Sequence, residues 1–186
     1  MPLHDVAKMT ETLSLLVDRT ETPLGEMMIV ADRAGRLRAI HWVDHEDTLR
    51  DELRRHYGAD GFAFETARDP GGLTRAMDAY FRGDLHAIDD LPVATGGTAF
   101  QRLVWAALRE IPCGATWSYS RLAQHIGRPA AVRAVGLANG ANPISIVVPC
   151  HRVVGANGTL TGYGGGLDRK RWLLAHEARA AEGRLL

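Results

Sequence analysis

A thiol, an imidazole and a guanidinium occupy consecutive positions, Cys150, His151 and Arg152, within the apolar stretch IVVPCHRVV. The β-branched residues before them predict a buried strand over 144–148 that ends at Pro149. Burial alone favours an inert cysteine. A thiol becomes a nucleophile, however, when a base or a positive charge stabilises its thiolate. The pattern therefore indicates that Cys150 is reactive and that His151 and Arg152 are the groups able to activate it.

Adjacent side chains on a strand point to opposite faces, so His151 reaches Cys150 only if the chain turns sharply between them. Pro149 favours such a turn because it fixes its own φ and biases Val148 toward extended backbone. We expect His151 to act on the sulfur through a water and to need a third group that orients its ring. Glu177, on the last predicted helix, is the candidate acid.

Charge is distributed unevenly along the chain. Residues 1–95 carry 11 Lys and Arg against 18 Asp and Glu, a net −7, whereas residues 96–186 carry 11 against 4, a net +7. The basic half is expected to attract polyanions, which makes nucleic-acid binding a hypothesis. Two other interpretations stay open, a solvated Arg-rich surface and a basic half that docks on the acidic half.

The composition is that of an ordinary folded protein. The 186 residues, 46% of them hydrophobic, can form one full core or two small ones. No apolar run is as long as a membrane span, and the N-terminus has no signal-peptide pattern. Two cysteines, Cys113 and Cys150, are too few for a disulfide framework. We therefore predict a cytoplasmic protein with no membrane partner.

The chain divides at residues 91–98, where Pro and paired Gly interrupt the pattern. This break coincides with the change in charge, so we predict an acidic domain over 1–95 and a basic domain over 96–186. Three apolar or alternating segments in the acidic half predict a β-meander, followed by helices over 47–57 and 73–81. Its histidines match no common zinc spacing and are predicted to lie on the surface or in packing.

Helices dominate the predicted basic half. A capping box of Thr98 and Gln101 opens a helix that runs to residue 108. Helices over 118–126 and 130–137 follow, the second with Pro129 just before it. Two short helices joined by a Gly-containing turn are typical of a helix-turn-helix, although an ordinary helical hairpin has the same pattern. The last helix is predicted over 167–180.

The motif Pro149-Cys-His-Arg-Val153 resembles the active-site motif of the methylated-DNA–protein-cysteine methyltransferases, also called O6-alkylguanine-DNA alkyltransferases. Further matching blocks are Asn142-Pro143, TWSYSRLA around Tyr119, AAVRAVGLANG around Arg133, TGYGGG at 161–166 and RWLLAHE at 171–177. The resemblance covers nearly all of residues 96–177, and the TPLG and PGGL…YFRG segments extend it over the N-terminal half. It implies a two-domain α+β fold. The N-terminal domain would be a ribonuclease H-like antiparallel sheet with helices, and the C-terminal one mostly helical with a winged helix-turn-helix.

The resemblance implies suicide DNA repair by a single-turnover methyltransferase. Cys150 would accept the alkyl group from the O6 of a damaged guanine, and O4-methylthymine is expected as a second substrate, with the preference between the two lesions left open. His151 would act as base through a water, Glu177 would hold His151, and Asn142 would tie the turn before the active-site strand. No cofactor motif is present, and no metal is expected because the N-terminal domain lacks cysteine. The protein would be inactivated by its one reaction.

DNA contacts are also implied by the resemblance. The residues assigned to DNA or base binding are Tyr119, Arg133, Gly136, Val148, Tyr163 and Gly165. The target base would be rotated out of double-stranded DNA, and Arg133 would fill its place in the stack. Small residues such as Gly136 would let the recognition helix approach DNA, unless they serve tight helix packing. The protein is expected to be a monomer, with cooperative binding on DNA left open.

Two positions depart from some family members, because Ser145 replaces a proline and Gly164 replaces a serine. These changes leave the preferred alkyl size open. Three alternatives to alkyl transfer also stay open. They are a non-catalytic binder of alkylated DNA, a thiol-based winged-helix sensor, and a cysteine hydrolase, which would turn over an ester or amide.

Overall fold

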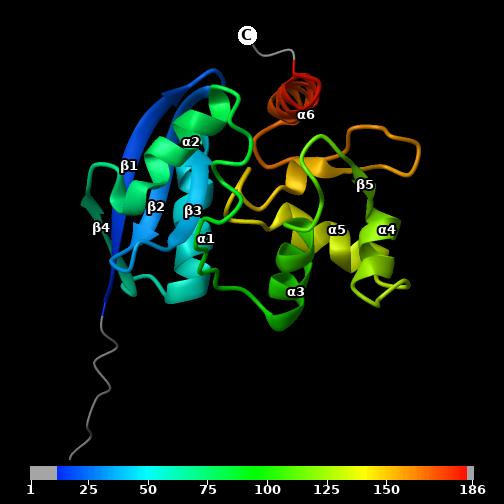
Figure 1. Ribbon diagram of the computed structural model, residues 1–186. Helices are drawn as coiled ribbons and strands as arrows, with labels where there is room; N and C mark the ends of the chain where they lie inside the picture. Colours follow the sequence, from blue (N-terminus) through cyan, green and yellow to red (C-terminus); the bar gives the residue numbers. More distant parts are fainter. Residues whose placement is uncertain (1–11, 184–186) are drawn as a thin grey trace, which may run out of the picture.

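The computed structural model describes residues 12–183 as a two-domain α+β protein. Figure 1 shows the sheet of the N-terminal domain beside the helices of the C-terminal domain. The sheet has the strand order β3-β2-β1-β4. Its strands are β1 (Leu13–Thr22), β2 (Gly25–Asp32), β3 (Leu37–Trp42) and β4 (Phe62–Thr66). The first three form the predicted antiparallel meander, whereas β4 pairs with β1 in parallel and was not expected from sequence.

Both faces of the sheet are covered, because β2 is buried along most of its length. Met28 and Val30 point to one face and join the cluster that contains Leu49 and Leu53 of α1 (Glu46–Tyr57). Their neighbours Met27, Ile29 and Ala31 point to the other face. There they share one continuous core with α2 (Leu73–Phe81) and with the C-terminal domain. Each buried aliphatic side chain stabilises this arrangement by about 1.5–3 kcal/mol.

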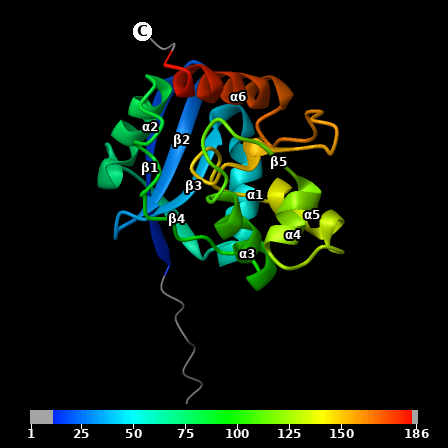
Figure 2. The same cartoon turned by 45° about the vertical axis from the view of Figure 1, so that its right-hand side comes forward.

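The C-terminal domain is mostly helical, as predicted. Its elements are α3 (Ala99–Leu108), β5 (Trp117–Ser118), α4 (Tyr119–His125), α5 (Val132–Gly140), β6 (Val153–Val154) and α6 (Leu167–Ala181). The predicted capping box is confirmed, since Thr98 Oγ1 accepts from the Gln101 amide and Gln101 Oε1 accepts from the Thr98 amide. Helix α6 lies across one end of the molecule, as Figure 2 shows.

One predicted element of this domain has a different start, and another is wrong. Helix α5 begins at Val132 rather than Ala130, and Pro129 lies in a turn in which the Ala131 amide donates to the Arg128 carbonyl. The predicted strand over 144–148 is instead a series of turns, with a single bridge from Ile144 to Ile40 of β3. The β-branched run is buried as expected, but its burial comes from turns and not from a sheet ladder.

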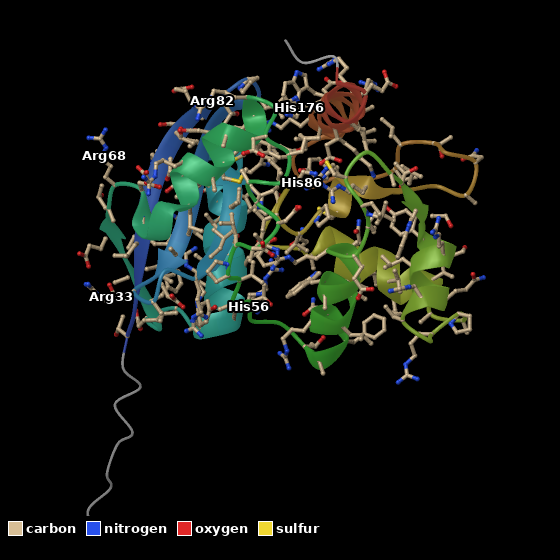
Figure 3. All side chains as sticks on the ribbon, in the orientation of Figure 1. Arg33, His56, Arg68, Arg82, His86 and His176 are labelled. Carbon is tan, nitrogen blue, oxygen red and sulfur yellow. The ribbon has the colours of Figure 1, made fainter. Side chains whose placement is uncertain are left out.

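Polar contacts join the two domains around this shared core. His176 of α6 hydrogen-bonds the Tyr80 carbonyl of α2 at 2.8 Å, and the Gly97 amide donates to His56 Nδ1 of α1 at 3.1 Å. Both histidines are labelled in Figure 3, where His176 faces α2. Arg33 and Arg68 point outward on the opposite side of the sheet. The basic groups of the N-terminal domain that Figure 3 labels there are therefore directed away from the C-terminal domain.

Candidate functional site

The turn that carries the thiol is held by one side chain, Asn142. Its Nδ2 donates to the Val148 carbonyl at 2.7 Å and to the Ile144 carbonyl at 3.3 Å, while its Oδ1 accepts from the Ile144 amide at 3.0 Å. Ile146 has a φ of 73°, which is strained for a β-branched residue. The hydrogen bonds of Asn142 hold residues 144–148 in a turn. This turn places Cys150 at the start of a short 3-10 helix, Cys150–Arg152.

Cys150 is 5% exposed. Burial raises the pKa of its thiol, although a contact with Asn142 and the charge of Lys170 act in the opposite direction. The thiolate is the nucleophilic form of cysteine. A buried thiol of this kind therefore needs a base close by before it can react.

Glu177 of α6 is the centre of a buried hydrogen-bond network. Its Oε1 accepts from His151 Nε2 at 2.8 Å, from Tyr80 Oη at 2.9 Å and from Arg152 Nη2 at 2.9 Å. Its Oε2 accepts from Arg152 Nε at 2.9 Å and from the Gly114 amide at 3.4 Å. Burial alone would raise the pKa of Glu177, but His151 and Arg152 outweigh burial and hold it well below its usual range. Glu177 is therefore an ionised carboxylate inside the protein.

His151 is fully buried, and burial lowers its pKa even though Glu177 acts in the opposite direction. The ring is therefore neutral near pH 7. A carboxylate can only accept a hydrogen bond, so Nε2 carries the ring proton and Nδ1 has the lone pair. Nδ1 is buried and has no hydrogen-bond partner among residues 12–183. His151 thus has a free basic nitrogen on the residue next to the thiol.

The cation beside the thiol is not the one that the sequence suggested. Arg152 directs its guanidinium to Glu177 and, through Nη1, to the Ile111 carbonyl at 2.7 Å. Lys170 of α6 is fully buried instead, and its Nζ donates to the Val153 carbonyl at 2.6 Å and the Thr161 carbonyl at 2.8 Å. The charge of Lys170 lowers the pKa of Cys150, whereas burial lowers that of Lys170 itself.

A surface groove and a deeper cavity adjoin at the site. The groove has a volume of about 570 Å³, and Tyr119, Arg133, Gly136 and Tyr163 are among its lining residues. The deep cavity has a volume of about 60 Å³ and is lined in part by Cys150, Asn139, Ser145, Tyr163, His41 and Glu52. Asn139 and Tyr163 line both spaces, so the groove leads toward the thiol.

Two family models match the chain in succession. The 6-O-methylguanine DNA methyltransferase ribonuclease-like domain matches residues 15–95, and the 6-O-methylguanine DNA methyltransferase DNA binding domain matches residues 99–179. The chain belongs to the 6-O-methylguanine DNA methyltransferase family. The resemblance noted from the sequence motifs is thereby confirmed.

Relatives of this methyltransferase family are similar over nearly their whole length. A methylated-DNA–protein-cysteine methyltransferase of Salmonella typhimurium is 56% identical over 165 residues, which cover 89% of this chain and 96% of the relative. The crystal structure of a Mycobacterium tuberculosis O6-methylguanine methyltransferase is 38% identical, with a TM-score of 0.74 over 89% of this chain and 94% of that one. A crystal structure of Mycobacterium tuberculosis OGT in complex with DNA is 37% identical, with a TM-score of 0.72 over 93% and 99%.

Most residues predicted for the methyltransferase site lie together in the structure. Cys150, His151, Glu177 and Asn142 form the buried part, and Tyr119, Arg133, Gly136 and Tyr163 line the groove. Val148 and Gly165 line neither space. The Val148 carbonyl is bonded to Asn142, and Gly165 packs so closely on Trp42 that an added Cβ would lie 2.5 Å from its ring.

Two buried residues were missed from sequence. Lys170 was missed although it shares one face of α6 with Leu173 and Glu177, a spacing that marks the buried stripe of a helix. Tyr80 was missed because nothing in the sequence links it to Glu177, 97 residues away.

Proposed function

We propose that this protein repairs alkylated DNA by moving the methyl group of O6-methylguanine to the sulfur of its own Cys150. The observation that carries the proposal is a buried cysteine whose neighbour, His151, is hydrogen-bonded to an ionised Glu177 in a chain of the 6-O-methylguanine DNA methyltransferase family. The same arrangement would be expected to act on other O6-alkyl groups and on O4-methylthymine.

Double-stranded DNA containing an alkylated base is the proposed partner. The methyl group of a stacked guanine is inaccessible to a buried thiol, so the base has to be rotated out of the duplex. Arg133 is exposed on α5 beside Leu137, which is 70% exposed. We assign Arg133 to the space that the base leaves in the stack, because its planar cation can stack and also attract phosphates. Gly136 would let the helix backbone come close to the DNA.

Tyr119 and Tyr163 are the groove residues that we assign to the rotated base. The Tyr119 hydroxyl accepts a hydrogen bond from Thr161 Oγ1 at 3.0 Å, which fixes the ring at the groove wall. Its own O–H can then donate to the base. We assign Val148 and Gly165 to other roles, because the Val148 carbonyl accepts from Asn142, Gly165 packs against Trp42, and neither lines the groove.

The proposed chemical step is one in-line displacement. His151 Nδ1 removes the thiol proton through a bridging water, Glu177 stabilises the resulting imidazolium, and the Lys170 charge stabilises the thiolate. Sγ of Cys150 then forms a bond to the methyl carbon as the carbon–O6 bond breaks. The bonding electron pair goes to the guanine, which takes back one proton and remains in the DNA strand as unmodified guanine. The thioether cannot return to a thiol, so each chain acts once.

The remaining assignments follow from this step. Because the thiolate itself is the acceptor, the reaction uses no cofactor and no metal. We propose that the domains are divided at residues 95 and 96, that the protein acts as a cytoplasmic monomer, and that the basic half makes DNA binding salt-dependent. No helix in residues 12–183 has the length and hydrophobicity of a membrane span.

The test is intact mass and peptide mapping after mixing the protein with a duplex that has one O6-methylguanine. The expected result is one added methyl group per chain, on the peptide that contains Cys150. Cys150→Ala should abolish the gain, whereas the control Cys113→Ser should retain it, because Cys113 lies outside both the groove and the deep cavity and a serine hydroxyl can keep its contact with Glu177. Binding without transfer would favour a damage binder or a sensor, and repeated turnover of an ester or amide would favour a hydrolase.

A further inference from the structure

The N-terminal domain contributes a polar wall to the deep cavity that contains Cys150. His41 of β3 and Glu52 of α1 both line this cavity, although neither belongs to the motifs of the C-terminal domain. They are 4% and 8% exposed, so the wall is almost completely screened from solvent. A buried imidazole and a buried carboxyl beside a nucleophile need an explanation that the transfer of a methyl group does not supply.

Hydrogen-bonding atoms of this wall are left without partners. His41 Nδ1, Glu52 Oε2 and Asn139 Oδ1 are buried and have no hydrogen-bond partner among residues 12–183. His41 Nε2 lies 4.0 Å from Glu52 Oε2, which is too far for a direct hydrogen bond. Folded proteins satisfy nearly all of their buried polar groups. A concentration of unsatisfied ones around a single cavity therefore indicates a place where a polar ligand group binds.

The charge state of the wall indicates what kind of group that is. Burial raises the pKa of Glu52 to about 7 and lowers that of His41 to about 4. Near pH 7, the imidazole is thus neutral and much of the carboxyl is protonated. No Lys or Arg lines the cavity within the described part of the chain. Such a wall can both donate to and accept from a neutral hydroxyl, and none of its own side chains carries a positive charge that would pair directly with an anion.

The size of the cavity limits the ligand further. Its volume of about 60 Å³ has room for only a few water-sized groups, since one water needs about 10–15 Å³ of such space. In an in-line displacement, the rest of an alkyl chain projects sideways from the line that joins sulfur, carbon and oxygen. It would therefore lie beside Cys150, where the deep cavity has room for a short extension of the alkyl chain.

We propose that His41, Glu52 and Asn139 form a subsite for the hydroxyl end of short hydroxyalkyl adducts, so that this protein prefers O6-(2-hydroxyethyl)guanine to apolar adducts of the same length. The proposal rests on the proposed function, since it specifies the alkyl group that the same thiol accepts. Glu52 and His41 act on specificity, because they contact the transferred group and not the sulfur or the leaving base.

The experiment compares single-turnover transfer rates on one duplex sequence that has, in turn, O6-methylguanine, O6-(2-hydroxyethyl)guanine, O6-propylguanine or O6-carboxymethylguanine. The hydroxyethyl and propyl groups have the same number of non-hydrogen atoms, so their ratio isolates the hydroxyl. We expect hydroxyethyl transfer to be about tenfold faster than propyl transfer, because only the hydroxyl satisfies the buried groups. The carboxymethyl group, as an anion, should be transferred more slowly than hydroxyethyl.

Two variants of Glu52 test whether this wall causes the preference for hydroxyethyl over propyl. Glu52→Leu should reduce the hydroxyethyl-to-propyl ratio to about one, whereas Glu52→Gln, which keeps a polar group of the same size, should retain most of it. Glu65→Gln, on exposed β4, is the matched control and should leave the ratio unchanged. Thermal unfolding shows whether each variant is folded.

Three outcomes would overturn the proposal, and they distinguish a failure of the subsite from a failure of the proposed function. Propyl transfer as fast as hydroxyethyl transfer, with methyl transfer intact, contradicts the subsite alone. A ratio that survives Glu52→Leu also contradicts it. Absence of methyl transfer by the folded wild-type protein contradicts the proposed function, and the subsite is then rejected with it.

Discussion

Each domain has a buried histidine near a buried glutamate. In the C-terminal domain, His151 Nε2 lies 2.8 Å from Glu177 Oε1. In the N-terminal domain, His41 Nε2 lies 4.0 Å from Glu52 Oε2. The two carboxyl groups have opposite properties. The pKa of Glu177 is held well below its usual range, and burial raises that of Glu52 to about 7.

The pKa values of the two carboxyl groups differ because different numbers of hydrogen-bond donors surround them. Glu177 also accepts from Arg152, Tyr80 and the Gly114 amide, while Glu52 Oε2 has no hydrogen-bond partner among residues 12–183. A buried carboxyl stays ionised only where a cation and several donors replace the water it has lost. The same two residue types therefore form a base-orienting pair in one domain and a neutral, unsatisfied wall in the other.

Removing the cation should have the largest effect. Arg152→Met leaves Glu177 buried without the arginine cation that pairs with it, so the free energy of unfolding should fall by about 3–5 kcal/mol. Urea unfolding at pH 7 measures this. Arg54→Met removes an exposed ion pair with Asp51 and should cost less than about 1 kcal/mol. An equal loss in both variants would show that Arg152 does not compensate a buried charge.

The pH dependence of stability should have opposite signs for the two carboxyls. Glu52 has a raised pKa in the folded state, so its contribution to stability is present below pH 4.5 and is lost as pH rises toward 7. Glu52→Gln should therefore gain about 3 kcal/mol relative to wild type between pH 4.5 and 7.5. Glu177 has a lowered pKa, so the disadvantage of Glu177→Gln should be present above pH 4.5 and shrink on acidification. Urea unfolding at several pH values tests both signs, and parallel profiles would refute the comparison.

Catalysis should depend on the ionised pair. Glu177→Gln removes the charge that stabilises the His151 imidazolium, and methyl transfer should slow by about 100-fold with little change in binding to the lesion duplex. Rapid-quench kinetics and a binding titration separate the two quantities. The matched control is Glu110→Gln, since Glu110 makes the same 2.8 Å contact to His125 on the surface and should not affect transfer.

The smallest expected effect concerns the contact between domains. Tyr80→Phe removes one hydrogen bond to the Glu177 carboxylate and should lower the free energy of unfolding by about 1.5–3 kcal/mol. Denaturant unfolding measures the loss. Tyr57→Phe, which removes a half-buried hydroxyl that accepts from Arg38, provides a comparison at a site away from Cys150. A negligible change at Tyr80 would mean that Arg152 and His151 suffice to hold the charge.

The sequence predicted the elements whose formation depends on residues close together in the chain. The alternation along 13–42 gives the β-meander, and the Thr98–Gln101 box gives the start of α3. Glu177 could also be named from sequence, because His151 needs an orienting acid and the matching RWLLAHE block contains one. The geometry then brings Glu177 to 2.8 Å from His151.

Other features depend on contacts that sequence does not display. The run before Pro149 has strand propensity, yet the hydrogen bonds of Asn142 fold it into turns and force Ile146 to a positive φ. A lysine is normally expected at the surface. Lys170 is buried because its ammonium group donates to the Val153 and Thr161 carbonyls, and the sequence does not show these contacts. The wall of His41 and Glu52 arises only when β3 and α1 pack against the turn of the other domain.

The position of Glu177 on the last helix also fixes an order of events during synthesis. A ribosome produces Cys150 and His151 before Glu177, so the carboxylate that orients the base arrives only when α6 closes over the site. If each chain acts once, as proposed, a reaction of the thiol before that point would consume the molecule without repair. The site around Cys150 is therefore complete only after α6, the last helix of the chain to be made, has packed on the rest of the C-terminal domain.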